Sequence, residues 1–338
     1  MTDRDKYYYE DYFESSDDFI SDLRKSRELG FPKKPLQNFF RGQKDSTWNL
    51  MPSAWRPKNA LNKIIDNTII KIEGAIERNT YPIWSSIKHD SINYKGDPII
   101  SVAQSYAEYY SLWQFVELSN LLGLKLFGSE EILSPEHFLN HPKVNAKWPK
   151  FHIYQILGLA QHHGIPTRLL DFSTDPFIAL WFAVDDAFND MINNRLLMNK
   201  HLDLEEARDF EYSNRHIDKK LALWEINFRF IEKDSLIKSL LCPRSEHSYL
   251  HAQSGIFLFI EDADLFYLEN GYWPSLDEII LEYAKKKYPH DRLILRKNII
   301  SVNCIPRLYL LLEKEGIFKS RLMPNFDNIA NQITTSWL

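Results

Sequence analysis

The sequence of 338 residues has little cysteine and little glycine. Its two cysteines, Cys242 and Cys304, are too few for a disulfide framework or a zinc site built on cysteine, so we expect a reduced, cytosolic chain. With eleven glycines in all, loops that wrap phosphate are scarce. The glycine motifs of P-loop and dinucleotide-binding folds are absent, and so is the Gly-x-Ser-x-Gly elbow of serine hydrolases.

Long apolar runs are missing as well. No stretch approaches the ~20 apolar residues of a membrane-spanning helix, and the acidic N-terminus lacks the apolar core of a signal peptide. We therefore predict a cytoplasmic protein with no membrane partner. The net charge of −5 argues against a general nucleic-acid coat protein. A basic stretch at residues 285–297 is typical of a solvated helix end, and it leaves a nucleic-acid-binding protein or nuclease as an alternative.

The sequence does have an ordinary apolar fraction of 44% and a high aromatic fraction of 14%, which exclude a disordered chain. Helical spacing comes first and strand patterns mostly later, and this order favours an α+β fold. We divide the chain into an acidic N-terminal helical arm at residues 1–30 and a domain at residues 31–338. The domain contains a helical segment at residues 59–127 and a charged, exposed insertion at residues 185–220.

Alternating and apolar runs predict the remaining elements. Strands are expected at residues 38–41, 223–230, 255–262 and 291–300, and helices near residues 151–163 and 306–316. In residues 223–230 the apolar and polar side chains alternate cleanly, so we predict a half-buried strand there.

One segment joins a polar stretch directly to an apolar one. Polar groups crowd the chain from Gln161 to Asp175, and the apolar run Phe177–Val184 follows. Asp175 and Pro176 are typical of a helix start, where an Asp side chain caps free amides and proline costs no hydrogen bond. The polar groups either form a buried network, with Arg168 paired to Asp171, or line a pocket; as a set they favour the pocket.

Two further positions can reach the same ligand. Arg41 precedes Gly42 at the end of a strand, where a guanidinium fork suits phosphate or carboxylate; a surface ion pair is the alternative. Gln253 precedes a predicted strand, so its amide can reach a ligand on the sheet. His247 and His251 stand four apart, as metal ligands on a helix do, but no metal motif accompanies them and we expect no metal.

Four motifs, in this order, resemble the FRG domain family, which is named after the Phe-Arg-Gly motif found here at Phe40–Gly42. They are Phe40–Gln43 followed by Trp48, Leu50, Pro52 and Arg56, then residues 160–183, residues 252–259, and residues 316–330. The resemblance spans about residues 37–332 and leaves the N-terminal arm outside. It implies a mixed, curved sheet flanked by helices, in a family found mostly in bacteria and their mobile elements.

A second resemblance is to ADP-ribosyltransferases. These enzymes bind NAD with an Arg or His on an early strand, a Ser-Thr motif on a middle strand that leads into a helix, and a Glu at the start of a later strand. Arg41, the pair Ser173–Thr174, and Gln253 stand at the matching places. The resemblance implies that Arg41 anchors the NAD pyrophosphate or ribose, and that Phe172 or Phe40 stacks the nicotinamide. Gln253 departs from it, because an amide stands where the transferases have a carboxylate.

Together the resemblances imply an NAD- or nucleotide-directed, ADP-ribosyltransferase-like enzyme that acts as a bacterial effector or in phage defence. NAD is the candidate substrate, and a protein or nucleic acid the candidate acceptor. The catalytic positions are Arg41, Thr174 and Gln253, and the binding pocket comprises Arg41, Gly42, Gln161, His162, His163, Arg168, Asp171, Ser173 and Thr174. A non-catalytic module that binds a nucleotide or a protein is the first alternative, and a nucleic-acid-binding protein or nuclease is the second.

Overall fold

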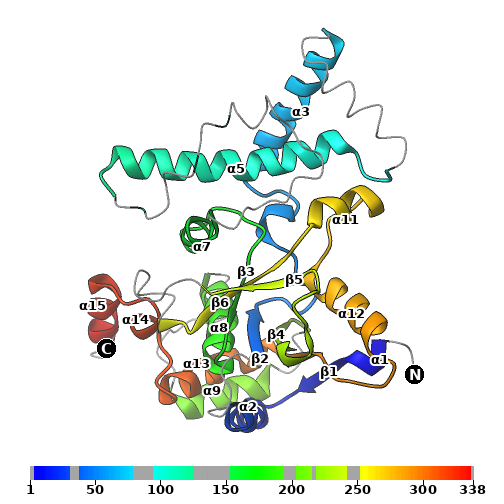
Figure 1. Cartoon of the computed structure of the whole chain (residues 1–338). Helices are drawn as coiled ribbons and strands as arrows, with labels where there is room; N and C mark the ends of the chain where they lie inside the picture. Colours follow the sequence, from blue (N-terminus) through cyan, green and yellow to red (C-terminus); the bar gives the residue numbers. More distant parts are fainter. Residues whose placement is uncertain are drawn as a thin grey trace.

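The computed structural model describes most of the chain (Figure 1). The described residues are 4–30, 38–78, 94–124, 126, 132, 135, 153–193, 203–214, 218–241 and 252–335. His247 and His251, the histidine pair considered as metal ligands, lie outside the described residues.

The described strands form one mixed sheet of seven strands in the order β1-β7-β4-β2-β3-β6-β5. The strands are β1 (Tyr8–Phe13), β2 (Asn38–Gln43), β3 (Leu170–Ser173), β4 (Lys220–Asn227), β5 (Ile237–Leu240), β6 (Gly255–Ile260) and β7 (Leu295–Ser301). β1 and β7 are parallel, and every other neighbouring pair is antiparallel. The prediction of an α+β fold with a mixed sheet flanked by helices is confirmed.

Helices cover both faces of this sheet, and Figure 1 shows α3 and α5 together at one end of the molecule. The helices are α1 (Arg4–Tyr7), α2 (Ser16–Gly30), α3 (Asn62–Glu77), α5 (Pro98–Leu121), α7 (Tyr154–His162), α8 (Pro176–Asn193), α9 (Leu204–Ser213), α11 (Ala263–Asn270), α12 (Leu276–Lys287), α13 (Ile305–Lys314), α14 (Lys319–Leu322) and α15 (Phe326–Thr335).

Strand β4 shows how the core is divided between the two faces. Leu221 and Leu223 belong to the cluster that α8, α13 and α2 build on one face. Trp224 and Ile226 belong to the cluster that α12 builds on the other. Because both faces are covered, the prediction of a half-buried strand is wrong. The strand ends at Asn227, and residues 228–230 form a 3₁₀ turn instead of continuing it.

The N-terminal segment contains a strand as well as a helix. β1 pairs with β7 over six residue pairs and forms one edge of the sheet. Arg296 of β7 holds this edge, since its Nε donates to Asp11 at 2.6 Å and its Nη2 lies 3.0 Å from the Asp22 carboxylate. The predicted helical arm at residues 1–30 is helical in α1 and α2, but residues 8–13 form a strand, because pairing with a strand from the far end of the chain decides their conformation.

The basic stretch at residues 285–297 does not form one solvated surface. Lys297 is 7% exposed, and its Nζ lies 4.5 Å from the centre of the Trp224 ring. The guanidinium of Arg292 lies 4.8 Å from the centre of the Tyr288 ring, and Lys287 pairs with Glu232 at 2.6 Å. Lys285 and Lys286 are exposed in the last turn of α12, as predicted for a solvated helix end, whereas the other three charges have partners within the protein.

Part of the region expected as an exposed insertion, residues 185–220, is packed. α8 continues to Asn193, and Glu211 of α9 is 4% exposed. The Glu211 carboxylate accepts hydrogen bonds from the amide of Ser16 at 3.1 Å and its hydroxyl at 2.7 Å, which compensate the loss of water. α9 is thus packed at Ala207 and Glu211, while most of its other residues are exposed, as expected for the insertion.

Candidate functional site

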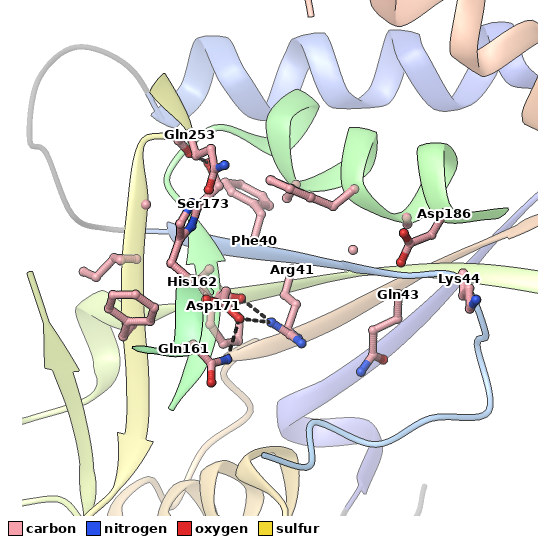
Figure 2. Close-up of a pocket in the computed structure, with 18 of the residues that line it drawn as sticks. Phe40, Arg41, Gln43, Lys44, Gln161, His162, Asp171, Ser173, Asp186 and Gln253 are labelled. Atoms are coloured by element: carbon pink, nitrogen blue, oxygen red, sulfur yellow. Dashed lines mark hydrogen bonds and ion pairs between the residues drawn. The ribbon is translucent and has the colours of Figure 1, made fainter. Parts of the chain in front are cut away.

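The sheet is weakest between β2 and β3. β2 pairs with β4 at six positions but with β3 at a single position, Phe40 opposite Ser173. A cavity of about 330 Å³ lies at this break, lined from both strands, from α7 and from α8 (Figure 2). Ala179, Phe182, Ala183 and Asp186 line it at helical spacing, so one face of α8 forms its wall.

The Phe-Arg-Gly motif has a physical reason here. Phe40 is 4% exposed and packs in the cluster that includes α8. A Cβ atom on Gly42 would lie 2.1 Å from the carbonyl oxygen of Ala179 and 2.9 Å from the Cβ of Ala183, so α8 rests directly on the backbone of β2. The residue between them, Arg41, extends its guanidinium toward β3.

Arg41 and Asp171 bridge the break. The Nη1 of Arg41 donates to the carbonyl oxygen of Asp171 at 2.6 Å and lies 3.6 Å from its Oδ2. Gln161 donates from Nε2 to the same Oδ2 at 2.8 Å, and its own Oε1 accepts from the Thr167 hydroxyl at 2.7 Å (Figure 2). The amide of Gln161 is therefore fixed with its NH₂ group toward the carboxylate.

The guanidinium of Arg41 is not fully satisfied. Its side chain is 16% exposed, whereas that of Asp171 is 54% exposed. Burial lowers the pKa of Arg41, and the neighbouring Asp171 opposes that shift. The Nε atom of Arg41 is buried and has no hydrogen-bond partner among the described residues. An unpaired buried donor costs about 1–3 kcal/mol, and an anion in the cavity would remove this cost.

A second arginine, Arg56, lines the same cavity, and we did not assign it to the pocket from the sequence. Its Nε donates to the carbonyl oxygen of Met51 at 3.0 Å. Burial lowers the pKa of Arg56, and the positive charge of Arg41 lowers it further, while Asp171 acts in the opposite direction. The two guanidiniums thus repel each other and share one nearby carboxylate. Arg56 stands in the first of the four motifs that resemble the FRG family, and this position was the signal in the sequence for a role in the pocket.

The two ends of the cavity differ in their chemistry. Figure 2 shows Lys44 and Asp186 at one end and Gln253 with Ser173 at the other. The Nζ of Lys44 lies 2.8 Å from the Oδ2 of Asp190. The ring of Trp48 lines the cavity and is 42% exposed, which is unusual for a tryptophan.

The three residues at the start of α8 have local structural partners. The Ser173 hydroxyl donates to the carbonyl oxygen of Gln253 at 2.9 Å. The backbone amide of Thr174 donates to the carbonyl oxygen of Ser254 at 3.1 Å. The Oδ1 of Asp175 accepts from the amide of Phe177 at 2.9 Å, which confirms the predicted helix cap. The Nε2 of Gln253 donates to the carbonyl oxygen of Leu322 at 3.2 Å.

Arg168 belongs to a different site. Its side chain is fully buried; its Nε lies 2.8 Å from the Glu108 carboxylate and its Nη1 2.8 Å from that of Asp264. Burial alone would lower the pKa of Arg168, but Asp264 and Glu108 raise it above its ordinary value. The expected pair with Asp171 is therefore wrong. A buried arginine needs carboxylates that water does not compete for, and α5 and α11 supply them.

The structure thus divides the predicted pocket into two groups. Arg41, Gly42, Gln161, His162, Asp171, Ser173 and Gln253 line the cavity. Among the residues that do not line it, Arg168 is in the buried network, Thr174 faces Ser254, and the ring of His163 stacks on Phe115 with 6.2 Å between ring centres. Ligand binding by the first group stays a prediction.

The described residues bear on the predicted lack of a metal and of a membrane partner. No group of three or more His, Cys, Asp and Glu side chains in this part of the chain is arranged to hold a metal ion. Within the same residues, no helix has both the length and the apolar character needed to cross a membrane.

The match to a known family covers the centre of this site. The model of the FRG domain matches residues 129–191. The resemblance of the chain to the FRG domain is thus confirmed over residues 129–191. The matched range includes α7, β3 and most of α8, and thus the wall that carries Gln161 and Asp171; Arg41 and Gln253 lie outside it. No curated protein and no solved structure matches the chain.

Proposed function

We propose that the cavity of this FRG domain binds a phosphate-containing nucleotide, with NAD as the candidate substrate. One observation carries the proposal: Arg41 and Arg56 line one small cavity, and each is partly deprived of water. Guanidiniums form short, paired hydrogen bonds with phosphate oxygens. A bound phosphate would satisfy the unpaired Nε of Arg41 and relieve the repulsion between the two cations.

The shape of the cavity supports a nucleotide over a simple anion. Its volume of about 330 Å³ is at the lower end of the range for small-molecule sites, roughly 300–1,000 Å³. Two aromatic side chains in its lining, Trp48 and Phe182, offer flat surfaces on which a base or a nicotinamide ring can stack. Phosphate chemistry and flat apolar surfaces together are what a nucleotide requires.

The catalytic form of the proposal is an ADP-ribosyltransferase-like reaction. The bond between nicotinamide and ribose would break, nicotinamide would leave with the electron pair, and an acceptor nucleophile would attack the ribose carbon. A carboxylate has to stabilise the positive sugar in such a reaction. Asp171 and Asp186 line the cavity and have this chemistry. A role as a bacterial effector or in phage defence rests on the family resemblance.

A non-catalytic nucleotide-binding module is the second candidate. Gln253 supports it, because an amide cannot carry the negative charge that a transferase needs, and this amide already donates to Leu322. The two candidates share the binding site and differ in turnover alone.

One experiment tests binding and turnover in parallel. NAD is added to the protein, and the melting temperature and the release of nicotinamide are followed for the wild type, Arg41→Ala and Arg56→Ala. We expect NAD to raise the melting temperature of the wild type, and each variant to lose at least about tenfold in affinity, or ~1.4 kcal/mol. Arg24→Ala, which removes an exposed arginine paired with Glu315, is the matched control and should bind as the wild type does.

Turnover in the wild type would favour the transferase, and binding without turnover the module. Both are overturned if NAD, ADP-ribose and ADP all leave the melting temperature of the wild type unchanged and no nicotinamide is released.

A further inference from the structure

A second cavity, of about 300 Å³, adjoins the first. Lys44 and Trp48 line both cavities. These two side chains therefore lie at the boundary between the two cavities. Each cavity alone is at the small end of the range for ligand sites, and joined they reach its middle.

The two cavities follow the same two elements in the same order. Along α8, Ala183 and Asp186 line the first cavity, and the next turns supply Asp190 and Met191 to the second. Along the other wall, β2 lines the first cavity and the residues directly after it, 44–48, line the second. The cavities therefore lie end to end along α8, and the two together are called the groove below.

The charges of the two cavities differ. Arg41 and Arg56 give the first a positive centre that Asp171 offsets in part. In the second, three lysines are balanced by three aspartates. The lysines are Lys44, Lys219 and Lys220, and the aspartates are Asp45, Asp190 and Asp218. A neutral site rich in carboxylate oxygens suits hydroxyl and amine groups better than it suits a second phosphate.

The second cavity also has an apolar side. Met191 is 2% exposed and Val302 6% exposed, so both are fixed in the core where they reach the lining. Polar groups of the lining come from residues 44–48, where the Thr47 hydroxyl donates to the Oδ1 of Asp45 at 2.7 Å. An apolar wall with hydroxyl-binding groups beside it is suited to a base and its sugar.

We infer that the groove takes a dinucleotide, with the phosphates and one nucleoside in the first cavity and the second nucleoside in the second cavity, beyond Trp48 and Lys44. The inference rests on the proposed function and adds a second binding site, the cavity lined by residues 44–48, for the second nucleoside of the ligand. Lys44, at the junction, lies where the anionic linker leaves Arg41 and Arg56.

The test compares ligands of one and two nucleosides. The affinities of NAD, nicotinamide mononucleotide and AMP are measured by calorimetry for the full chain and for Thr47→Trp. Thr47 is exposed and lines the second cavity, so the larger ring fills that cavity without disturbing the core. Asn49→Trp, at an exposed position outside both linings, is the matched control.

We expect NAD to bind at least about tenfold more tightly than either mononucleotide. Thr47→Trp should remove this advantage and leave the better mononucleotide unaffected, while Asn49→Trp changes neither. If NAD binds no more tightly than the better mononucleotide, or Thr47→Trp leaves NAD affinity unchanged while Arg41→Ala lowers it, the two-cavity inference is wrong and the proposed function stands. If none of the three ligands binds the wild type, both are wrong.

Discussion

Two arginines of this chain, Arg168 and Arg41, are both withdrawn from water, yet their surroundings differ. Arg168 is completely buried between Glu108 and Asp264, and all three of its guanidinium nitrogens donate to carboxylates. Arg41 lies against Asp171, which is half exposed, and keeps one buried nitrogen without a described partner.

This difference distinguishes an arginine with a structural role, Arg168, from one that can still bind a ligand, Arg41. Around Arg168 the protein supplies a carboxylate to each guanidinium nitrogen, so a ligand has nothing to add, and the network ties the segment before β3 to α5 and α11. Around Arg41 the set of partners is incomplete, and a second guanidinium, Arg56, adds to the positive charge. Sites that bind anions are expected to look like the second case, because the ligand completes the hydrogen bonding.

The largest effect is expected for Arg168→Met. The substitution keeps an apolar stem but leaves two buried carboxylates without their cation, which costs about 3–5 kcal/mol of unfolding free energy. Urea denaturation measures it, with Arg24→Met as the control, since an exposed pair such as Arg24–Glu315 is worth at most about 1 kcal/mol. Equal losses for the two variants would contradict the structural role of Arg168.

The next effect in size is expected for Gly42→Ala, at the contact between β2 and α8. The new methyl group would fall 2.1 Å from the carbonyl oxygen of Ala179, so strand and helix must separate. Overpacking of this kind costs about 1–3 kcal/mol, and the separation should also disturb the cavity wall and weaken NAD binding.

A matched glycine makes this prediction specific. Gly74 is inside α3, and a Cβ there would meet the flexible end of the Arg78 side chain at 3.2 Å. Gly74→Ala should leave stability unchanged or raise it by up to about 1 kcal/mol, because alanine favours helix. If Gly42→Ala behaves in the same way, the close packing of α8 on β2 is not as described.

Local features of the site could be predicted from the sequence. The cap at Asp175, the strand before Gly42 and the polar stretch from Gln161 depend on neighbours within a few residues, and such signals are visible in a single chain. Gln161, Asp171 and Arg41 were placed in the pocket for this reason, and the structure brings them together.

Long-range partners could not be predicted in the same way. The carboxylates of Arg168 are 60 and 96 residues away in the sequence, whereas Asp171 is close in sequence and was the natural choice. The conformation of residues 8–13 depends on β7, at the other end of the chain. Both errors come from reading a local pattern where tertiary contacts decide.

A smaller effect on stability is expected for Arg41→Met. Asp171 remains in contact with water and keeps its hydrogen bond from Gln161, so no buried charge is stranded. The unfolding free energy should change by less than about 1 kcal/mol, as for an exposed pair, while nucleotide affinity falls. A loss as large as that of Arg168→Met would remove the distinction between the two arginines.

The smallest effect, and one that depends on pH, is expected for Glu225→Gln in β4. The side chain of Glu225 is 15% exposed, and burial raises its pKa, which Arg296 offsets in part. A carboxyl whose pKa is higher in the folded state stabilises the protein when protonated, and this contribution is lost as the pH rises through the folded pKa. The amide never ionises, so Glu225→Gln should gain stability relative to the wild type between pH 4 and pH 7.

Urea midpoints measured across this range test the sign of the effect. A gain in stability confined to the acid end would mean that Arg296 more than compensates the buried charge of Glu225. Glu225 would then belong with Arg168 among the fully partnered groups.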